Sequence, residues 1–522
     1  MTETTTTADV SDVRTQLEAE LGADVRVMTE LEDRFVYSIE KWFDEYRDPH
    51  SDEAGLPAIV VRVKSVDATE TARRILEASG YTPVNRDSLA QSNLEGRDNV
   101  ALIDATDVWH LPADLDNQAR SITQPDLRVN HTESTDVFIQ DRCESHHICK
   151  GYCPINRTVY DDVETFSAKG RAIISRELTT DADSPIDHSR RVSDILFSCA
   201  ACGNCFRPCT DELTTMYEGL IEGKREIIES RDGVVPSSIQ EVLENTFLYG
   251  NPGGQPEKRR AAWTREVDVD VRIVEPGESV DVLLFVGCEA SYDERNQVIA
   301  ESLARTFDAM DLDWGILGTA ESCAGNHQRA LGEEGLFEEQ VDRNAEALTA
   351  VDYETLVTAD PHSYHSFKTE YLDYGVDLDP IHYTQFLVEC LDPEAFDDDP
   401  GDVRRVTYHD SCYLGTHNDV TAEPRELLEW LPGYEFVDIE SQALCCGGGG
   451  GRMWYEDPYV EERPSQPVVE LAMAEKVDVL AVACPFCAST FEEARKTNDL
   501  EESFTVRDIS ELVIEALDGF VD

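Results

Sequence analysis

The chain has 522 residues, of which 41% are hydrophobic and 29% are charged. This length corresponds to three or four domains of ordinary size, and the apolar content excludes a wholly disordered chain. With 107 acidic against 44 basic side chains, the formal net charge is −63 at pH 7. Such a surface repels nucleic-acid phosphates and anionic lipid headgroups. The acid is spread along the whole chain, which indicates a hydrated surface in a salt-rich cytoplasm rather than a cation-binding function.

Apolar runs are short throughout: none reaches 18 residues, so the sequence predicts no transmembrane helix. The N-terminus, MTETTTTADVSD, is polar and acidic, unlike a secretory signal. We therefore expect a cytoplasmic protein, at most docked on the inner face of a membrane through a partner. Fifteen cysteines in a reducing compartment are better candidates for metal ligands than for disulfides.

Residues 1–135 contain no cysteine and predict a small α/β domain. Apolar spacing predicts helices over residues 11–21 and 68–79, and short apolar runs predict strands over 58–61 and 100–103.

Residues 136–255 carry seven of the fifteen cysteines in two tight groups, and we predict a mainly helical domain of the ferredoxin type there. The second group has the spacing C-x2-C-x2-C-x3-C. Three closely spaced thiolates can hold three corners of a [4Fe–4S] cluster, and in two-cluster ferredoxins the fourth Cys of such a run ligates the other cluster. Zinc or free thiols are the alternatives, but zinc sites usually pair two C-x2-C halves that lie well apart. A breaker-rich stretch, GNPGGQP at 250–256, predicts a linker after this domain.

The first group follows the same register but has His146 where the pattern has Cys. A His ligand to iron is chemically reasonable and tends to raise the potential, as in Rieske centres. The alternative is that His146 does not bind and the site holds a three-iron cluster, a water ligand or an open iron. With crossed fourth ligands, the predicted sets are Cys143, His146, Cys149 and Cys209 for one cluster, and Cys199, Cys202, Cys205 and Cys153 for the other.

Residues 278–392 and 403–520 form an internal repeat. Strands that alternate with longer helical patterns predict two tandem Rossmann-like α/β domains, with chemistry at the carboxyl ends of the strands. A constant offset of 124 residues separates Cys288 from Cys412, Asp360 from Cys484 and Ser363 from Cys487.

The second repeat gathers five thiols, and Cys446 is followed by five glycines that allow the backbone to approach a site closely. Five soft donors are too many for a simple tetrahedral ion and suit a larger cluster. The predicted set is Cys412, Cys445, Cys446, Cys484 and Cys487.

The first repeat keeps only Cys288 and Cys323 of this set, with Asp360 and Ser363 at the later positions. These groups hold a cluster poorly, so we interpret the first repeat as largely structural. A reversible Cys288–Cys323 pair or a weaker metal site is the alternative. Cys390 lies on a helical pattern, and we predict it to be a buried core thiol.

These motifs together resemble the iron–sulfur subunits related to heterodisulfide reductase, and those of glycolate oxidase and anaerobic glycerol-3-phosphate dehydrogenase. The resemblance covers about residues 136–520. It is closest in the second cysteine-rich (CCG) domain, through His409-Asp-x-Cys412, Cys445-Cys446-Gly447 and Cys484-Pro-x-Cys487. In heterodisulfide reductase such five-Cys sets hold a noncubane [4Fe–4S] cluster that cleaves a disulfide. The resemblance therefore implies that cluster, and a catalytic role, for the five cysteines of the second repeat.

The resemblance also implies an electron-transfer subunit. A flavoprotein dehydrogenase partner would oxidise a 2-hydroxy acid or similar metabolite, and a quinone, reached through a membrane-bound partner, or another acceptor would take the electrons. The alternative is a thiol–disulfide reductase acting at the second CCG domain, although related reductases use both repeats. A redox sensor without turnover is a third hypothesis.

The N-terminal segment resembles the start of FAD-linked oxidase domains. Those domains continue with a Gly-rich flavin-phosphate loop, whereas residues 84–89 here read VNRDSL. We expect no flavin in this chain and a docking or remnant role for this domain.

Overall fold

The computed structural model describes residues 8–30, 33, 59–63, 66–85, 100–104, 152–160, 163–180, 186–206, 213–396, 403–439, 444–459 and 463–518. The chain divides into two compact units, Met1–His147 with Lys169–Asp187, and Ile148–Ala168 with His188–Asp522. Among the described residues, none of the helices combines the length and the apolar character needed to cross a bilayer.

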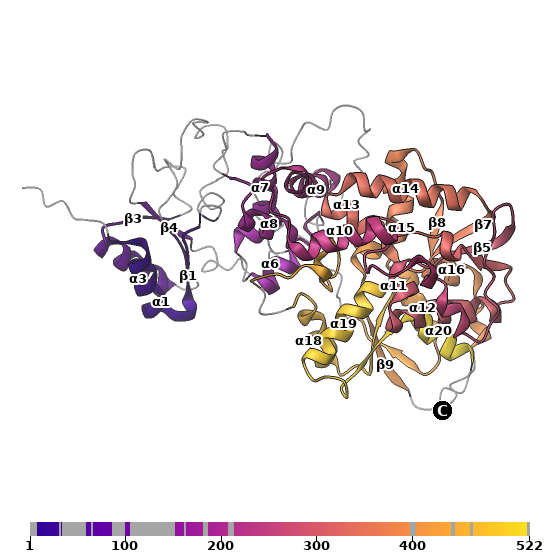
Figure 1. Ribbon diagram of the computed structural model, residues 1–522. Coiled ribbons are helices and arrows are strands. Elements are labelled where there is room, and N and C mark those ends of the chain that lie inside the picture. Colours follow the sequence, from indigo (N-terminus) through magenta and orange to yellow (C-terminus); the bar gives the residue numbers. More distant parts are fainter. Residues whose placement is uncertain are drawn as a thin grey trace, which may run out of the picture. The chain divides into compact units, whose positions relative to one another are not determined.

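The first unit contains a small α/β sheet (Figure 1). The strand order is β1-β2-β4-β3; β1 is antiparallel to β2, and the other pairs are parallel. All five residues of β2 are buried, which explains the unbroken apolar run in its sequence. The helices and strands predicted for this part are present, with ends that differ by at most two residues. The elements are α1 (Val10–Leu21), β1 (Val25–Met28), β2 (Ile59–Val63), α3 (Val66–Ala78), β3 (Thr82–Asn85) and β4 (Val100–Asp104).

Between residues 152 and 250 the described residues form helices and no strand, in agreement with a mainly helical segment. Local signals fix the helix ends: the Ser189 hydroxyl accepts a hydrogen bond from the Val192 N–H at the start of α8, and Gly250 takes a left-handed conformation after α10. The helices are α6 (Pro154–Val159), α7 (Ala168–Thr180), α8 (Arg190–Phe197), α9 (Leu213–Glu229) and α10 (Ser237–Tyr249).

The first repeat is a parallel four-stranded sheet in the order β6-β5-β7-β8. Helices connect its strands, as parallel neighbours require. The elements are β5 (Ser279–Phe285), α11 (Cys288–Tyr292), α12 (Glu294–Ala309), β6 (Trp314–Ile316), α13 (Asn326–Leu331), α14 (Glu334–Thr349), β7 (Asp352–Thr358), α15 (Pro361–Lys368), β8 (Pro380–His382) and α16 (Tyr383–Cys390).

The second repeat has the same topology, a parallel sheet in the order β10-β9-β11-β12. In each sheet the first strand of the chain lies second in the strand order, the second strand of the chain lies at its edge, and the third and fourth strands follow on the other side. The predicted repeat and its two parallel α/β domains are therefore confirmed. The elements are β9 (Arg404–Tyr408), the π-helix η11 (Cys412–Thr416), α17 (Ala422–Trp430), β10 (Tyr434–Phe436), α18 (Gln466–Glu475), β11 (Val479–Val482), α19 (Pro485–Thr497), β12 (Thr505–Asp508) and α20 (Ile509–Leu517).

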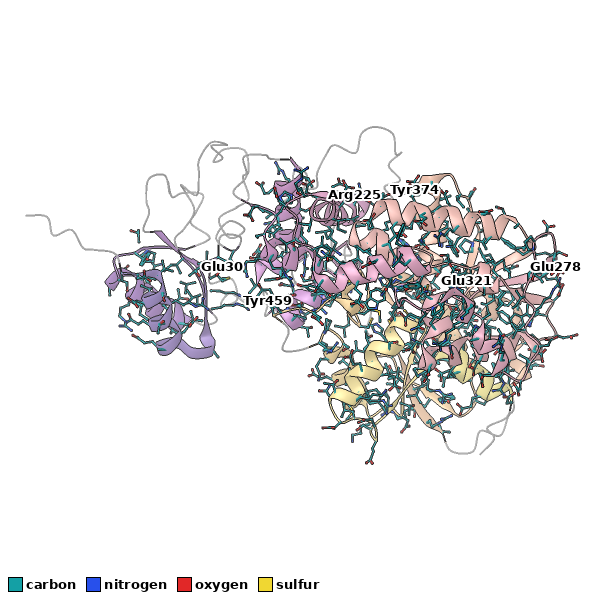
Figure 2. All side chains as sticks on the ribbon, viewed as in Figure 1. Glu30, Arg225, Glu278, Glu321, Tyr374 and Tyr459 are labelled. Atoms are coloured by element: carbon teal, nitrogen blue, oxygen red, sulfur yellow. The ribbon has the colours of Figure 1, made fainter. Side chains whose placement is uncertain are left out.

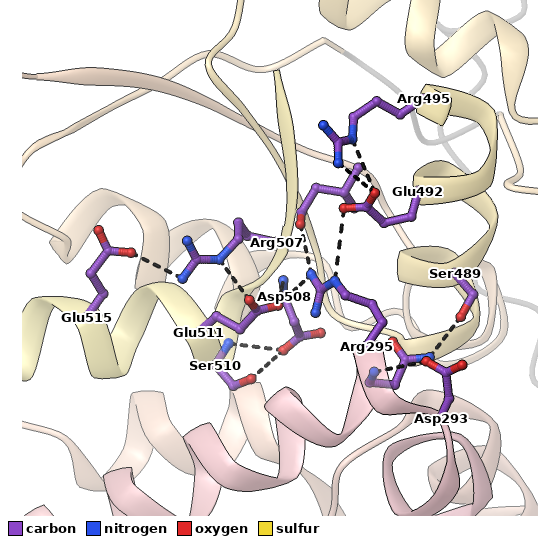
Figure 3. A network of polar contacts seen from close by, with 12 residues as sticks. Asp293, Arg295, Ser489, Glu492, Arg495, Arg507, Asp508, Ser510, Glu511 and Glu515 are labelled. Carbon is purple, nitrogen blue, oxygen red and sulfur yellow. Dashed lines mark hydrogen bonds and ion pairs between the residues drawn. The ribbon is translucent and has the colours of Figure 1, made fainter. Parts of the chain in front are cut away.

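The two repeats share one hydrophobic core. Leu303 and Phe307 of α12 belong to the same buried cluster as Leu512 and Val513 of α20. Polar contacts continue this interface (Figure 3): the Arg295 guanidinium bonds the Glu511 carboxylate at 2.8 Å. The repeats therefore stabilise each other through packing that neither could complete alone.

Asp508 lies at this interface with its carboxylate fully buried. Its Oδ1 accepts hydrogen bonds from the Tyr383 hydroxyl at 2.6 Å and from the Ser510 N–H at 3.0 Å, while its Oδ2 has no partner among the described residues. Burial raises the pKa of Asp508 from 3.8 to about 6, because the charged form loses its hydration.

We expect Asp508→Asn to gain stability relative to the wild type as the pH rises. Between pH 3.8 and 6 the unfolded state has released a proton that the folded state still holds, so the wild type loses stability with rising pH, by about 3 kcal/mol in all. About 1 kcal/mol of this loss falls between about pH 5 and 7, and the amide loses none. Denaturant unfolding at constant high salt measures the two curves. Parallel pH dependences of the two proteins would contradict the shift.

Candidate metal centre

The chemistry-bearing residues of the second repeat follow the ends of its two central strands. β9 ends at Tyr408 and leads into Cys412, while β11 ends at Val482 and leads into Cys484 and Cys487 at the start of α19. Because β9 and β11 are parallel neighbours, their carboxyl ends lie at one edge of the sheet. The topology thus places these thiols together, as the sequence predicts.

The five thiols of the second repeat lie in one buried group. Each is at most 5% exposed. The sulfur atoms of Cys446 and Cys487 are 3.3 Å apart. Hydrogen-bond contacts link Cys445 to Cys412 and to Cys446, and Cys487 to Cys484. The structure therefore brings together all of Cys412, Cys445, Cys446, Cys484 and Cys487.

A sixth thiol joins this group from the ferredoxin-type run. Cys202 is 8% exposed and is in hydrogen-bond contact with Cys445. The run around Cys202 is held against the second repeat on both sides. The Asn204 amide donates to the Leu444 carbonyl at 3.3 Å, and the His417 ring nitrogen lies 3.0 Å from the Ala201 carbonyl. Sequence spacing predicts each cysteine set but contains no signal for the contact between them.

The glycine run after Cys446 forms the other side of this junction. A Cβ atom on Gly449 would lie 2.6 Å from the Ala200 carbonyl oxygen, and one on Gly450 would lie 2.8 Å from the Cys199 carbonyl oxygen. Gly450 also has a positive φ of 61°. The glycines therefore allow close approach, as predicted, and the backbone that they approach is that of the Cys199–Ala201 segment.

His409 supplies a nitrogen donor that is not part of the ligand set predicted from the sequence. The ring is 1% exposed, and its Nδ1 has no hydrogen-bond partner among the described residues. One ligand atom of each of His409, Cys446 and Cys487 lies within 4.8 Å of the others. Burial lowers the pKa of His409, which keeps the ring neutral and able to act as a donor to a metal. Its place directly after β9, in the same short segment as Cys412, was the available signal.

This donor set fits an iron–sulfur cluster. When several buried thiols are deprotonated, their negative charges are costly in an interior without water. Bound iron ions would compensate that charge. The orphaned His409 nitrogen adds an unused donor at the same place. More sulfurs are present than one tetrahedral ion can bind.

Four further histidines line the junction between the repeats. His327 and His362 stack with ring centroids 4.7 Å apart, and His417 stacks on Tyr413 at 4.5 Å. Burial lowers the pKa of His327 and of His417 to about 3 and that of His365 to about 4. These rings are therefore neutral at physiological pH and extend the aromatic packing around the thiols.

The other predicted cluster ligands divide into two groups. Cys153 is buried at the N-terminus of α6, Cys199 accepts a hydrogen bond from the Ala201 N–H at 3.4 Å, and Cys205 is half-buried. The remaining predicted ligands, Cys143, His146, Cys149 and Cys209, lie outside the described residues.

The later positions of the first repeat serve the fold. The Asp360 carboxylate accepts hydrogen bonds from the His362 and Ser363 N–H groups at the start of α15, and from the Ser363 hydroxyl at 2.6 Å. Asp360 is thus a helix cap, consistent with a structural first repeat. The prediction for Cys390 is wrong: this thiol is exposed. It is the last residue of α16, and the chain buries Leu391 in its place.

Known proteins share the cysteine-rich repeats of this chain. The family model of the cysteine-rich domain, CCG, matches residues 282–368 and 406–492. The probable iron–sulfur-binding oxidoreductase FadF of Bacillus subtilis (strain 168) is 31% identical over 332 residues, which cover 62% of this chain and 47% of the relative. The EtfAB:quinone oxidoreductase of Syntrophomonas wolfei is 29% identical over 338 residues, with coverages of 62% and 47%.

A third relative is covered over most of its length. This relative, from Methanosarcina barkeri, is one of the subunits of a dihydromethanophenazine:CoB–CoM heterodisulfide reductase. It is 29% identical over 335 residues, which cover 62% of this chain and 78% of the relative. By contrast, the chain spans about half the length of the first two relatives. The chain therefore carries the CCG cysteine-rich domain twice, and it is similar to an iron–sulfur-binding oxidoreductase and to a subunit of a heterodisulfide reductase.

Proposed function

We propose that this chain is the iron–sulfur electron-transfer subunit of an oxidoreductase complex. It would pass electrons between a flavoprotein dehydrogenase, acting on a 2-hydroxy acid or similar metabolite, and a quinone or other acceptor. The contact between Cys202 and Cys445 carries this proposal, because it joins the ferredoxin-type run directly to the CCG thiols. Two clusters bound at this junction would exchange electrons without an intervening electron carrier.

The residues present would hold three clusters. Iron–sulfur clusters bound there would supply one-electron redox chemistry. We propose ferredoxin-type [4Fe–4S] clusters on two sets and a noncubane [4Fe–4S] cluster on the third. The sets are Cys143, His146, Cys149 and Cys209; Cys199, Cys202, Cys205 and Cys153; and Cys412, Cys445, Cys446, Cys484 and Cys487.

The protein itself contributes position and environment. The five thiols of the second repeat are buried, so water is excluded from them. The reduction potential of a cluster bound by them would therefore depend on neighbouring dipoles. Arg425 fixes the segment between β9 and Cys412, because its guanidinium forms two bonds of 2.7 Å to the Asp410 carboxylate. Such a fork holds the Cys412 loop in one geometry.

The names of relatives support the choice of partners. One relative is called an EtfAB:quinone oxidoreductase, a name that gives that relative EtfAB and a quinone as its redox partners. We therefore propose a flavoprotein subunit as electron donor and a quinone-reactive membrane partner as acceptor. The first unit, with its separate sheet, would be the docking element for one of them.

The test is co-purification and reduction at native salt. Affinity purification of the full chain at high salt is expected to recover a flavin-containing protein, identified by flavin fluorescence of the eluate. Anaerobic mixing with that protein in its reduced state should then bleach the cluster absorbance of the chain. Purification of the chain alone as a fully active dehydrogenase would contradict the proposal.

A thiol–disulfide reductase is the second candidate. The relation to a subunit of a heterodisulfide reductase favours it, and so does the buried five-thiol set. Reduced viologen with small-molecule disulfides provides the assay. Turnover that disappears in Cys446→Ser would support this candidate, and absence of turnover with every disulfide tried would reject it.

A further inference from the structure

The first repeat holds two thiols of its own, apart from the metal centre. Cys288 begins α11, and Cys323 lies in the loop that follows β6. The two thiols lie close enough for each to shift the pKa of the other, and Cys323 Sγ also donates a hydrogen bond to Gln328 Oε1 at 3.6 Å. Cys288 is partly exposed, whereas Cys323 is 7% exposed. The Cys288 thiol is therefore accessible to a small molecule from solvent, whereas the Cys323 thiol is buried.

A buried arginine faces the reachable thiol. Arg260 Nη2 lies 3.4 Å from Cys288 Sγ, and Arg260 Nη1 bonds Glu321 Oε1 at 2.8 Å. The Glu321 carboxylate is fixed in turn by the N–H groups of Val286 and Gly287, at 3.0 and 2.9 Å. Glu321 is 4% exposed and is labelled in Figure 2. The guanidinium is thus held against the sulfur by a rigid network rather than by a mobile side chain.

The charges make the two thiols unequal. The interaction with Cys323 and the positive charge of Arg260 lower the pKa of Cys288, in spite of burial. The same contact and burial raise the pKa of Cys323. A thiolate beside a cation, paired with a protonated neighbour, is the usual arrangement of an attacking and a resolving cysteine.

A metal site fits these residues poorly. Arg260 presents a positive charge to Cys288, which repels a metal cation. The carboxylate of Asp360 is occupied by the start of α15. In the part of the chain that the structure describes, three metal-binding side chains converge at His409, Cys446 and Cys487 and not at Cys288.

We propose that Cys288 and Cys323 form a redox-active dithiol that reduces low-molecular-weight disulfides by exchange. The Cys288 thiolate attacks one sulfur of the disulfide, forming a mixed disulfide and releasing one thiolate. Cys323 loses its proton and attacks Cys288 Sγ, which closes the Cys288–Cys323 bond and releases the second thiolate. Two protons reach the released thiolates, so one dithiol and one disulfide become one disulfide and two thiols. This step does not rest on the proposed electron-transfer function.

The test uses the full chain with its clusters, under anaerobic conditions at high salt. After incubation with oxidised glutathione and alkylation, mass spectrometry of the peptides is expected to find Cys288 linked to Cys323. Cys323→Ser should stop the reaction at one glutathione on Cys288. Cys390→Ser is the matched control in the same repeat, because it removes an exposed thiol, and should leave the linked peptide unchanged.

Arg260 gives a second readout. In Arg260→Gln, alkylation of Cys288 at about pH 7 should slow about tenfold and recover at alkaline pH, whereas Arg260→Lys should keep most of the rate. Separate alkylation of both thiols with no linked peptide would overturn the proposal. Loss of iron in the double variant Cys288→Ser, Cys323→Ser would also overturn it, because the thiols would then be cluster ligands. Neither result bears on reduction of the clusters by a flavoprotein.

Discussion

Replacement of Cys445 and Cys446 together by serine is expected to lower the iron content from about twelve to about eight atoms per chain. The two adjacent thiols connect Cys412 and Cys202 on one side to Cys487 on the other, so their loss divides the donor set of the second repeat. Iron and acid-labile sulfide assays, with low-temperature EPR on protein purified anaerobically at high salt, measure the change. The EPR signals of the two ferredoxin-type clusters should remain.

The matched control for this experiment is Cys390→Ser, which removes an exposed thiol that belongs to none of the predicted ligand sets. It should leave the iron content at about twelve. About eight irons in the wild type, unchanged by the double substitution, would contradict a cluster in the CCG domain. The chain would then be a relay of two clusters, and disulfide chemistry at the five thiols of the second repeat would be excluded.

Gly450→Ala is expected to destabilise the protein by about 3 kcal/mol, through backbone strain and a steric clash together. The φ of Gly450 is 61°, and an added Cβ would lie 2.8 Å from the Cys199 carbonyl oxygen. Backbone on both sides leaves little room for relaxation. Denaturant unfolding at constant high salt measures the loss. We also expect slower electron transfer, because the clash pushes the Cys199 segment away from the CCG thiols.

Gly277→Ala separates the two contributions. Gly277 also has a positive φ, 86°, but a Cβ there would meet no atom within 4 Å. This variant should lose about 1 kcal/mol, the cost of the backbone conformation alone. Equal losses in the two variants would mean that the glycine run does not press on the Cys199 segment.

The sequence predicts the parts of the metal centre that depend on regular structure. Cys412 and Cys484 each follow an apolar strand, and parallel neighbouring strands place such residues at one edge of a sheet. The contact of Cys202 with Cys445 could not be predicted in this way. It joins distant segments of the chain through tertiary packing, for which no local pattern exists.

The segment after residue 250 shows the same limit. Its glycines and prolines predict a linker, yet Arg260 and Trp263 just beyond it are buried in the first repeat. The Gly250 carbonyl accepts a hydrogen bond from the Cys323 N–H at 2.9 Å. Breaker residues indicate where regular structure ends, but they do not show whether the chain then leaves the core.

The shared core of the two repeats has a consequence for how the protein is made. α12 and α20 pack against each other, although about 200 residues of chain separate them. At a synthesis rate of about 5–20 residues per second, α20 is synthesised roughly 10–40 seconds after α12. During this interval the surface of α12 that α20 covers in the complete protein has no partner. We therefore expect the nascent chain to need protection from aggregation before the second repeat, which contributes the five cluster thiols, is complete.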